Sequence, residues 1–230
     1  DEEKTAWANY VRATVRHFAG RVTHYEIWNE PDGKWCWKHG VSAEEYGRFA
    51  HDTAKAIREV SDDAFIIGGS VCMIWDLSYM DTALSAGMAG SVDAVTFHEY
   101  TADETALYTH VPALEALIHL HDPKIRLIQG ESGSQSRSDG CGALAGGAWT
   151  PERQAKQCLR HAVADLSTDV LFSSYFSCMD MIEALNGKVG DKTSYLDYGY
   201  FGILGADFDE NGFSSGEYSP KPSYYAYQNL

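Results

Sequence analysis

Two glutamates, each placed directly after a short hydrophobic run, are the residues of this chain best suited to chemistry. Glu30 lies in Trp28-Asn29-Glu30-Pro31, and Glu131 lies in Gln129-Gly130-Glu131-Ser132-Gly133. Two parallel strands that end in carboxylates can supply a general acid/base and a nucleophile, the pair that a retaining glycosidase needs. The two glutamates therefore predict double-displacement chemistry at a glycosidic bond.

Helical and strand-like hydrophobic patterns alternate along the chain. Ser42, followed by Ala43-Glu44-Glu45, predicts a capping box, and Thr150-Pro151 predicts a helix start with proline in the first turn. The spacing of apolar residues predicts helices over residues 6–19, 42–60, 77–86, 106–120 and 150–166, and a short helix from Pro222. Apolar runs predict strands over residues 22–28, 65–69, 92–98, 125–129 and 170–176, and a hairpin around 200–204.

This βα alternation predicts an α/β fold in one domain, with a parallel sheet covered by helices. Successive strand ends at Glu30, Ser70, His98 and Glu131 are separated by roughly the 30 residues of one βα unit. The expected fold is a (β/α)8 TIM barrel that is incomplete, with about the last five βα units present and the N-terminal units missing. An open five-stranded sheet of flavodoxin type is the alternative.

Strand periodicity predicts which side chains meet. Residues i and i+2 share a face, so Glu26 and Glu30 point one way and His98 and Tyr100 share a face of the third strand. In a barrel these faces are interior, and Glu30, His98, Tyr100 and Glu131 should converge at the mouth. Glu26 should lie one layer deeper, where it needs a cationic or hydrogen-bonding partner.

The motifs resemble those of clan A glycoside hydrolases over essentially the whole chain. Trp28-Asn29-Glu30-Pro31 resembles the signature that ends their fourth strand, and Gly130-Glu131-Ser132-Gly133 resembles the end of their seventh. His98-Glu99-Tyr100 is similar to the His-x-Tyr that ends the sixth strand, and residues 221–230 resemble the final helix. Within the clan, the β-xylosidase/α-L-iduronidase family and the endoglucanase-type families are nearest.

The resemblance implies that Glu30 is the general acid/base, that Glu131 is the nucleophile and that Asn29 binds the sugar 2-hydroxyl. It implies that Tyr100 or His98 positions Glu131 and keeps it ionised. A poorly solvated Glu30 is expected to have a raised pKa, so that it holds a proton. Retention of configuration would require the two carboxyl groups to lie about 5 to 5.5 Å apart.

Aromatic residues near the strand ends are expected to contact the sugar or to cap the core. Trp35, Trp37 and Trp75 each follow a strand end and are candidate sugar platforms. The last strand lacks the tryptophan that many clan members place beneath the reactive sugar, and Tyr175 or Phe176 is its expected substitute.

Composition and charge limit the classes of partner. The chain has 230 residues, 44% of them hydrophobic, and a net charge of −15. This charge argues against nucleic acid and anionic membrane surfaces and fits an oligo- or polysaccharide substrate. There is no apolar run of the roughly 18 residues that span a bilayer and no signal-peptide pattern, so the enzyme is either cytoplasmic or secreted with its leader removed.

Other chemistries find little support. The five cysteines are widely spaced without a Cys-x-x-Cys pair, so neither a disulfide framework nor a metal site is expected, and no cofactor is predicted. No glycine-rich phosphate motif follows a strand, Ser132 and Ser134 form no Gly-x-Ser-x-Gly elbow, and His119 and His121 are expected to be solvated. Residues 207–210 resemble a calcium loop only loosely and favour a solvated turn.

Two further expectations follow from the incomplete barrel. The alternative function is a catalytically silent carbohydrate-binding or scaffold protein derived from a glycosidase. The first and last strands of a five-stranded sheet would be exposed edges, so a missing N-terminal segment or a partner chain is expected to complete the barrel. Alone, these 230 residues should be oligomeric or prone to aggregation and weakly active at best.

Overall fold

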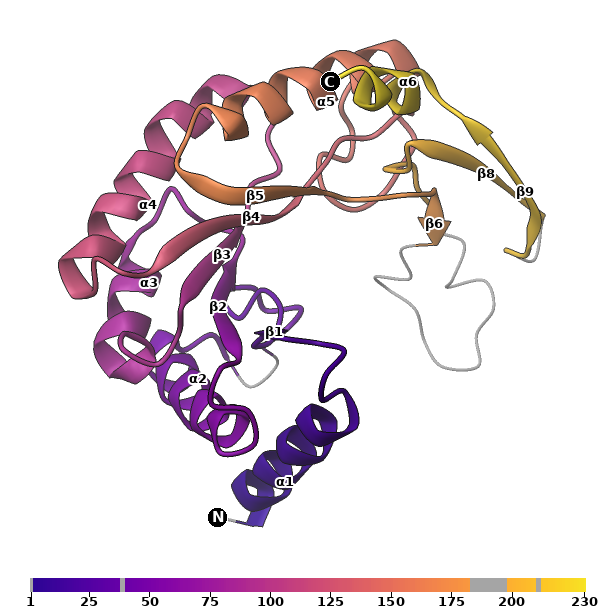
Figure 1. Ribbon diagram of the computed structural model, residues 1–230. Coiled ribbons are helices and arrows are strands. Elements are labelled where there is room, and N and C mark those ends of the chain that lie inside the picture. Colours follow the sequence, from indigo (N-terminus) through magenta and orange to yellow (C-terminus); the bar gives the residue numbers. More distant parts are fainter. Residues whose placement is uncertain (1, 38–39, 183–197, 210–211) are drawn as a thin grey trace. The chain divides into compact units, whose positions relative to one another are not determined.

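The computed structural model describes residues 2–37, 40–182, 198–209 and 212–230 (Figure 1). The chain divides into two compact units. Unit 1 comprises Asp1–Glu99, Thr109–Gly130 and Asp169–Phe172, and unit 2 comprises Tyr100–Tyr108, Glu131–Thr168 and Ser173–Leu230. The single catalytic domain expected over residues 1–230 stays a prediction.

A five-stranded sheet forms the centre of unit 1. Its strands are β1 (His24–Glu26), β2 (Phe65–Val71), β3 (Ala94–His98), β4 (Arg126–Ser132) and β5 (Val170–Tyr175), and the last residues of β4 and β5 belong to unit 2. The strands neighbour one another in sequence order, and the β1–β2 and β2–β3 pairs are parallel. A flavodoxin-like sheet would have the order 2-1-3-4-5. The sequential order instead belongs to the wall of a (β/α) barrel, which confirms the incomplete-barrel prediction.

Helices alternate with these strands along the chain (Figure 1). They are α1 (Glu2–His17), α2 (Ala43–Arg58), α3 (Ser78–Ala83) with the π-helical turn η1 (Leu84–Met88), and α4 (Leu107–His121), whose first residues belong to unit 2. Helix α2 packs against α1, α3 and η1. Its N-cap is Ser42, whose Oγ accepts a hydrogen bond from Glu45 N at 3.2 Å, so the predicted helix start is confirmed. None of the described helices is long and apolar enough to cross a bilayer.

Tyr46 of α2 anchors this helix to the sheet. Its side chain is fully buried, and its hydroxyl donates to Ile27 O at 3.0 Å and accepts from Gly69 N at 2.9 Å. Gly69 has φ +91°, and a Cβ atom there would lie 2.7 Å from Thr96 O, so this strand end requires glycine. The tyrosine therefore fixes the C-terminal ends of β1 and β2, where the candidate catalytic residues begin.

Two elements of unit 1 differ from their predicted bounds. β1 has three residues rather than the seven expected over 22–28, because Trp28 adopts a left-handed conformation with φ 69° and leaves the extended path. The helix expected over 77–86 is α3 followed by a π-helical turn, in which Gly87 has φ 122°. Left-handed residues of this kind leave no trace in hydrophobic periodicity.

Unit 2 contains helix α5 (Pro151–Leu166), which packs against the 3-10 turn η2 (Glu104–Ala106) and the closing helix α6 (Pro222–Gln228). β6 (Met181–Ile182) pairs with β7 (Tyr198–Gly199), and β8 (Leu204–Phe208) pairs with β9 (Ser214–Pro220), both antiparallel. The hairpin expected around residues 200–204 is therefore wrong. All of β9 is exposed, so this strand lacks the alternating burial that would have marked it in the sequence.

Removal of the Thr150 hydroxyl should weaken α5. Thr150 Oγ1 accepts a hydrogen bond from Arg153 N at 3.2 Å, and Pro151 occupies the first turn, as predicted. We expect Thr150→Ala to lower the free energy of unfolding by about 1 kcal/mol, measured by urea denaturation. Thr150→Ser retains the hydroxyl, so the free energy of unfolding of this variant should remain near that of the unchanged protein. Equal destabilisation by both substitutions would show that the cap is not the cause.

Candidate active site

Glu30 lies in a loop that is held against the sheet by its own backbone. The chain turns sharply after β1, because Trp28 and Glu30 both have positive φ, 69° and 42°. Glu30 N donates to Ser70 O at the end of β2, at 3.0 Å. Positive φ is costly for residues other than glycine and is characteristic of functional loops. The turn brings the Glu30 side chain to the C-terminal end of the strands of unit 1.

The Glu30 carboxylate receives hydrogen bonds from both sides. His98, the last residue of β3, is only 3% exposed, and its Nδ1 lies 3.0 Å from Glu30 Oε1. The indole Nε1 of Trp35 donates to Glu30 Oε2. The Trp35 side chain itself remains 58% exposed. Sequence reasoning predicted both residues near the site, and the structure brings each of them to Glu30.

The hydrogen bonds also decide the direction of the pKa shift of Glu30. Burial raises this pKa, but the hydrogen bonds from His98 and Trp35 and the charge of His98 together outweigh it. The pKa of Glu30 therefore lies below its ordinary value, and the raised pKa expected from the sequence is wrong for this arrangement. Periodicity indicated the desolvation but could not indicate that two donors converge on the same carboxylate.

Glu26 was expected one layer deeper than Glu30, but it is exposed on β1, and its carboxylate still has hydrogen-bond partners. Glu26 Oε1 accepts hydrogen bonds from Ser70 Oγ and from Thr96 Oγ1, the latter at 2.7 Å. Ser70 N in turn donates to Thr96 Oγ1 at 3.0 Å. Hydroxyl donors from β2 and β3 thus satisfy a carboxylate of β1, so the predicted need for a partner is confirmed.

Asp32 is a further acidic residue of this loop that sequence reasoning missed. It is buried, and its carboxylate accepts from Cys72 N at 3.0 Å and from Met73 N at 2.9 Å. Burial raises the pKa of Asp32, while these backbone donors lower it in part. The carboxylate ties the loop after β1 to the loop after β2. The sequence signal that could have identified Asp32 is its position directly after Asn29-Glu30-Pro31.

In unit 2, Glu131 is held by Tyr100. The Tyr100 hydroxyl donates to Glu131 Oε1 at 2.5 Å, and the Tyr100 ring packs edge-on against Phe201 at 5.9 Å between centroids. Sequence reasoning named Tyr100 or His98 as the residue that positions Glu131. The Tyr100 hydroxyl makes such a contact, and the positioning role stays a prediction.

The chain after Glu131 is fixed by polar side chains that sequence reasoning did not identify. Gln135 Nε2 donates to Cys141 O at 2.6 Å, and Gln135 Oε1 accepts from Tyr200 N at 2.9 Å. Lys221 Nζ lies 2.5 Å from Asp180 Oδ1 and donates to Ser136 Oγ at 2.8 Å. Burial raises the pKa of Asp180 and lowers that of Lys221, so each charge depends on the other. No periodicity links these distant segments.

The remaining predicted contact residues have varied surroundings. Asn29 Nδ2 lies 3.5 Å from Cys36 Sγ at an exposed position, and Trp75 is 61% exposed in the loop after β2. The ring of Tyr175 packs against Tyr227 of α6 with 5.4 Å between centroids. Trp37 contacts the rings of Trp28, Tyr46 and Phe49 and so caps the core, the second role considered for it.

The residues expected to lie outside the site have ordinary structural contacts. In the last turn of α4, His119 Nε2 lies 3.2 Å from Ile125 O, and His121 Nε2 lies 2.7 Å from Asp81 Oδ1. No disulfide joins cysteines in the described part of the chain. Asp209, in the segment likened to a calcium loop, bonds to Phe213 in the turn between β8 and β9, and residues 210–211 lie outside the described part of the chain.

Comparison with solved structures identifies the class of fold. A GH39 β-xylosidase from Caulobacter crescentus matches with a TM-score of 0.62 and 20% identity over 98% of this chain and 46% of its own. The GH39 enzyme from Xanthomonas axonopodis pv. citri matches with a TM-score of 0.67 and 19% identity, over 98% of this chain and 45% of its own. A GH2 β-galacturonidase from Eisenbergiella tayi matches with a TM-score of 0.66 and 16% identity, over 99% of this chain and 37% of its own. The chain thus shares its fold with (β/α)-barrel glycosidases and spans less than half the length of these structures.

The chain belongs to glycosyl hydrolases family 39, because the model of that family matches residues 1–119, more than half of the sequence. The matched region contains Glu30, His98 and Tyr100. Membership confirms the resemblance to clan A glycoside hydrolases.

Loss of the Trp35 donor should raise the pKa of Glu30. Trp35→Phe keeps an aromatic ring and removes the indole N–H, so one of the groups that lower this pKa disappears while burial remains. Carboxyl-carbon NMR titration would measure the pKa, with Glu30→Gln identifying the resonance. The matched control is Trp75→Phe, which changes an exposed tryptophan of the neighbouring loop. This variant should leave the pKa of Glu30 unchanged. An unchanged or lower pKa in Trp35→Phe would contradict the assignment.

Proposed function

We propose that this chain carries the catalytic residues of a retaining glycoside hydrolase that cleaves a β-linked glycan, with Glu30 as acid/base and Glu131 as nucleophile. The observation that carries the proposal is the pairing of Glu30 with His98 and Trp35 within a family 39 sequence. A half-buried carboxylate whose pKa is shifted by specific side-chain partners is a candidate functional group rather than part of an ordinary surface turn.

The positions of the two glutamates in the sheet support a common site. Glu30 follows β1 and Glu131 is the second-last residue of β4, the first and fourth strands in the sheet order. Parallel strands of a (β/α) barrel end at the same face, where active sites of this fold lie. We propose that the two carboxyl groups approach to about 5 to 5.5 Å, the separation that gives retention.

Each glutamate has partners that suit its proposed role. Tyr100 donates to Glu131 Oε1 and so orients the carboxylate proposed as the nucleophile. Glu30 must hold a proton to act as the acid. The hydrogen bond from Trp35 is one of the contributions that lower the pKa of Glu30, so a sugar that displaced this indole would remove that contribution. Asn29 is the proposed partner of the sugar 2-hydroxyl, and Trp75 and Tyr175 are the more distant contacts proposed for the glycan.

Azide rescue should separate the two roles by stereochemistry. Glu131→Gly in the intact protein should lower hydrolysis of an activated aryl β-glycoside on the order of 10³-fold or more. Azide should restore turnover in this variant and form the inverted glycosyl azide, because a single displacement occurs. In Glu30→Gly, azide should give the azide of retained configuration, because it attacks a glycosyl enzyme already formed on Glu131. Product NMR distinguishes the two anomers.

Three outcomes would contradict this proposal. A glycosyl azide of retained configuration from Glu131→Gly would show that the roles of the two glutamates are exchanged. Unchanged turnover in both variants would place catalysis elsewhere. An intact protein that hydrolyses no aryl glycoside, yet binds sugar equally well with Glu30→Gln or Glu131→Gln, would favour the catalytically silent carbohydrate-binding protein.

We propose further that another segment or partner chain covers both edges of the sheet. β1 and β5 are its outer strands, and large apolar side chains are exposed beside them, including Trp28 at 43%, Leu171 at 41% and Phe172 at 51%. Unpaired strand edges and exposed apolar groups favour association. Light scattering after size exclusion should therefore find the isolated 230-residue chain oligomeric or aggregated. A monomer that melts cooperatively and has normal turnover would refute this proposal.

A further inference from the structure

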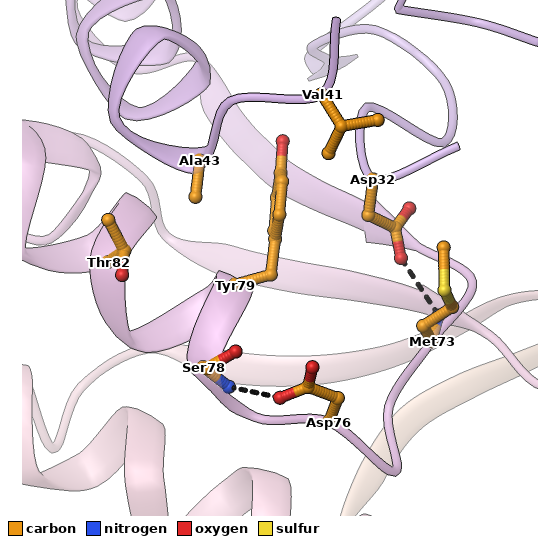
Figure 2. Close-up of a pocket in the computed structure, with 8 residues that line it drawn as sticks. All are labelled: Asp32, Val41, Ala43, Met73, Asp76, Ser78, Tyr79 and Thr82. Atoms are coloured by element: carbon orange, nitrogen blue, oxygen red, sulfur yellow. Dashed lines mark hydrogen bonds between the residues drawn. The ribbon is translucent and has the colours of Figure 1, made fainter. Parts of the chain in front are cut away.

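A cavity of about 350 Å³ opens between the loops that follow β1 and β2 in unit 1. Figure 2 shows the ring of Tyr79 standing in its middle, with Asp32 and Met73 on one side and Ala43 and Thr82 on the other. Its lining residues are Asp32, Val41, Ala43, Met73, Asp76, Ser78, Tyr79 and Thr82. Small-molecule sites in proteins begin at about 300 Å³, so the volume suits a single sugar ring.

The walls combine apolar surface with hydrogen-bonding groups. Val41, Ala43, Met73 and the Tyr79 ring offer C–H and aromatic surface, and the hydroxyls of Ser78 and Thr82 and the carboxylate of Asp76 are polar. The Tyr79 hydroxyl is buried and has no hydrogen-bond partner among the described residues. Apolar walls with a few convergent polar groups suit a sugar, which presents both C–H faces and hydroxyls.

The charge of the lining restricts the ligand. Of the eight residues that line the cavity in the described part of the chain, two are acidic and none is basic. Asp76 is exposed and accepts from Ser78 N at 3.0 Å, and Asp32 is buried, with its carboxylate bonded to Met73 N at 2.9 Å. Carboxylates accept hydrogen bonds from sugar hydroxyls but repel a carboxylated sugar.

The cavity lies on the Glu30 side of the candidate site. Asp32 is two residues from Glu30, and the two carboxylates both act on the Cys72 thiol, whose pKa is raised by burial and then by the charges of Asp32 and Glu30. In a retaining glycosidase the acid/base protonates the leaving group. A sugar beyond the scissile bond would therefore extend past Glu30 toward this cavity.

We propose that the cavity between Asp32, Tyr79 and Thr82 binds the leaving-group sugar of the substrate and selects an uncharged, hydroxyl-rich ring over a uronate. The assignment to the leaving group rests on the proposed function, whereas sugar binding in the cavity does not. The Tyr79 ring and Met73 contact the C–H face, and Ser78, Thr82 and Asp76 bind hydroxyls at the rim.

Binding is tested by amide NMR titration of the intact protein with D-xylose and, separately, with D-glucuronate. The amides of Ser78 and Thr82 should shift saturably with D-xylose and not with D-glucuronate. Ala43→Phe places a ring in the cavity and should weaken D-xylose binding at least about tenfold, and Asp76→Asn should allow D-glucuronate to bind. Ala13→Phe and Asp52→Asn, at exposed positions of α1 and α2, are the matched controls and should leave both titrations unchanged.

The leaving-group role is tested by kinetics with two substrates. Ala43→Phe should lower kcat/KM for a β-linked disaccharide at least about tenfold more than for the glycosyl fluoride of the same sugar, whose leaving group is too small to fill the cavity. Equal losses for the two substrates would overturn this role.

Failure of the sugar-binding site and failure of the proposed function would give different results. The absence of saturable shifts at Ser78 and Thr82, or equal shifts with D-glucuronate, would overturn the binding site. Saturable, Ala43→Phe-sensitive shifts in an intact protein without any glycosidase turnover would support the sugar site and refute the proposed function.

Discussion

Three acidic side chains in and after β1, the exposed Glu26, the half-buried Glu30 and the buried Asp32, are all hydrogen-bonded within unit 1. Glu26 receives hydroxyls from Ser70 and Thr96, and Asp32 receives two backbone amides. Glu30 receives an indole N–H and lies beside a histidine. The donors matter most for Asp32 and Glu30, because an unsatisfied charge that is buried or partly buried would be destabilising.

This requirement couples stability to the geometry of the candidate site. The donors reach the carboxylates only because the chain adopts left-handed conformations at Trp28, Glu30 and Ser70, at the ends of β1 and β2. Tyr46 holds the same strand ends from the helix side through Ile27 O and Gly69 N. Such strained positions persist where surrounding contacts define them uniquely. The same bonds that stabilise unit 1 thus keep Glu30 in one orientation.

In unit 2, different residues hold the second candidate glutamate and the chain that follows it. Glu131 is held by a tyrosine hydroxyl, and the chain after it is fixed by Gln135 and by the Lys221–Asp180 pair. A buried ion pair of this kind adds little net stability but defines one arrangement of the segments that it joins. The family 39 match covers residues 1–119 and so includes Glu30 but not Glu131, and the chain spans less than half the length of the solved structures that it resembles.

The sequence by itself determined the alternation of helices and strands as far as β5 and the caps at Ser42 and Thr150, because periodicity and capping are local properties. The partner of each carboxylate was decided only by the tertiary structure. The donors to Glu30, Asp32 and Glu131 come from other loops or strands, and left-handed backbone at Trp28 shortens β1. The direction of the Glu30 pKa shift depends on the balance between burial and those donors, which no local pattern records.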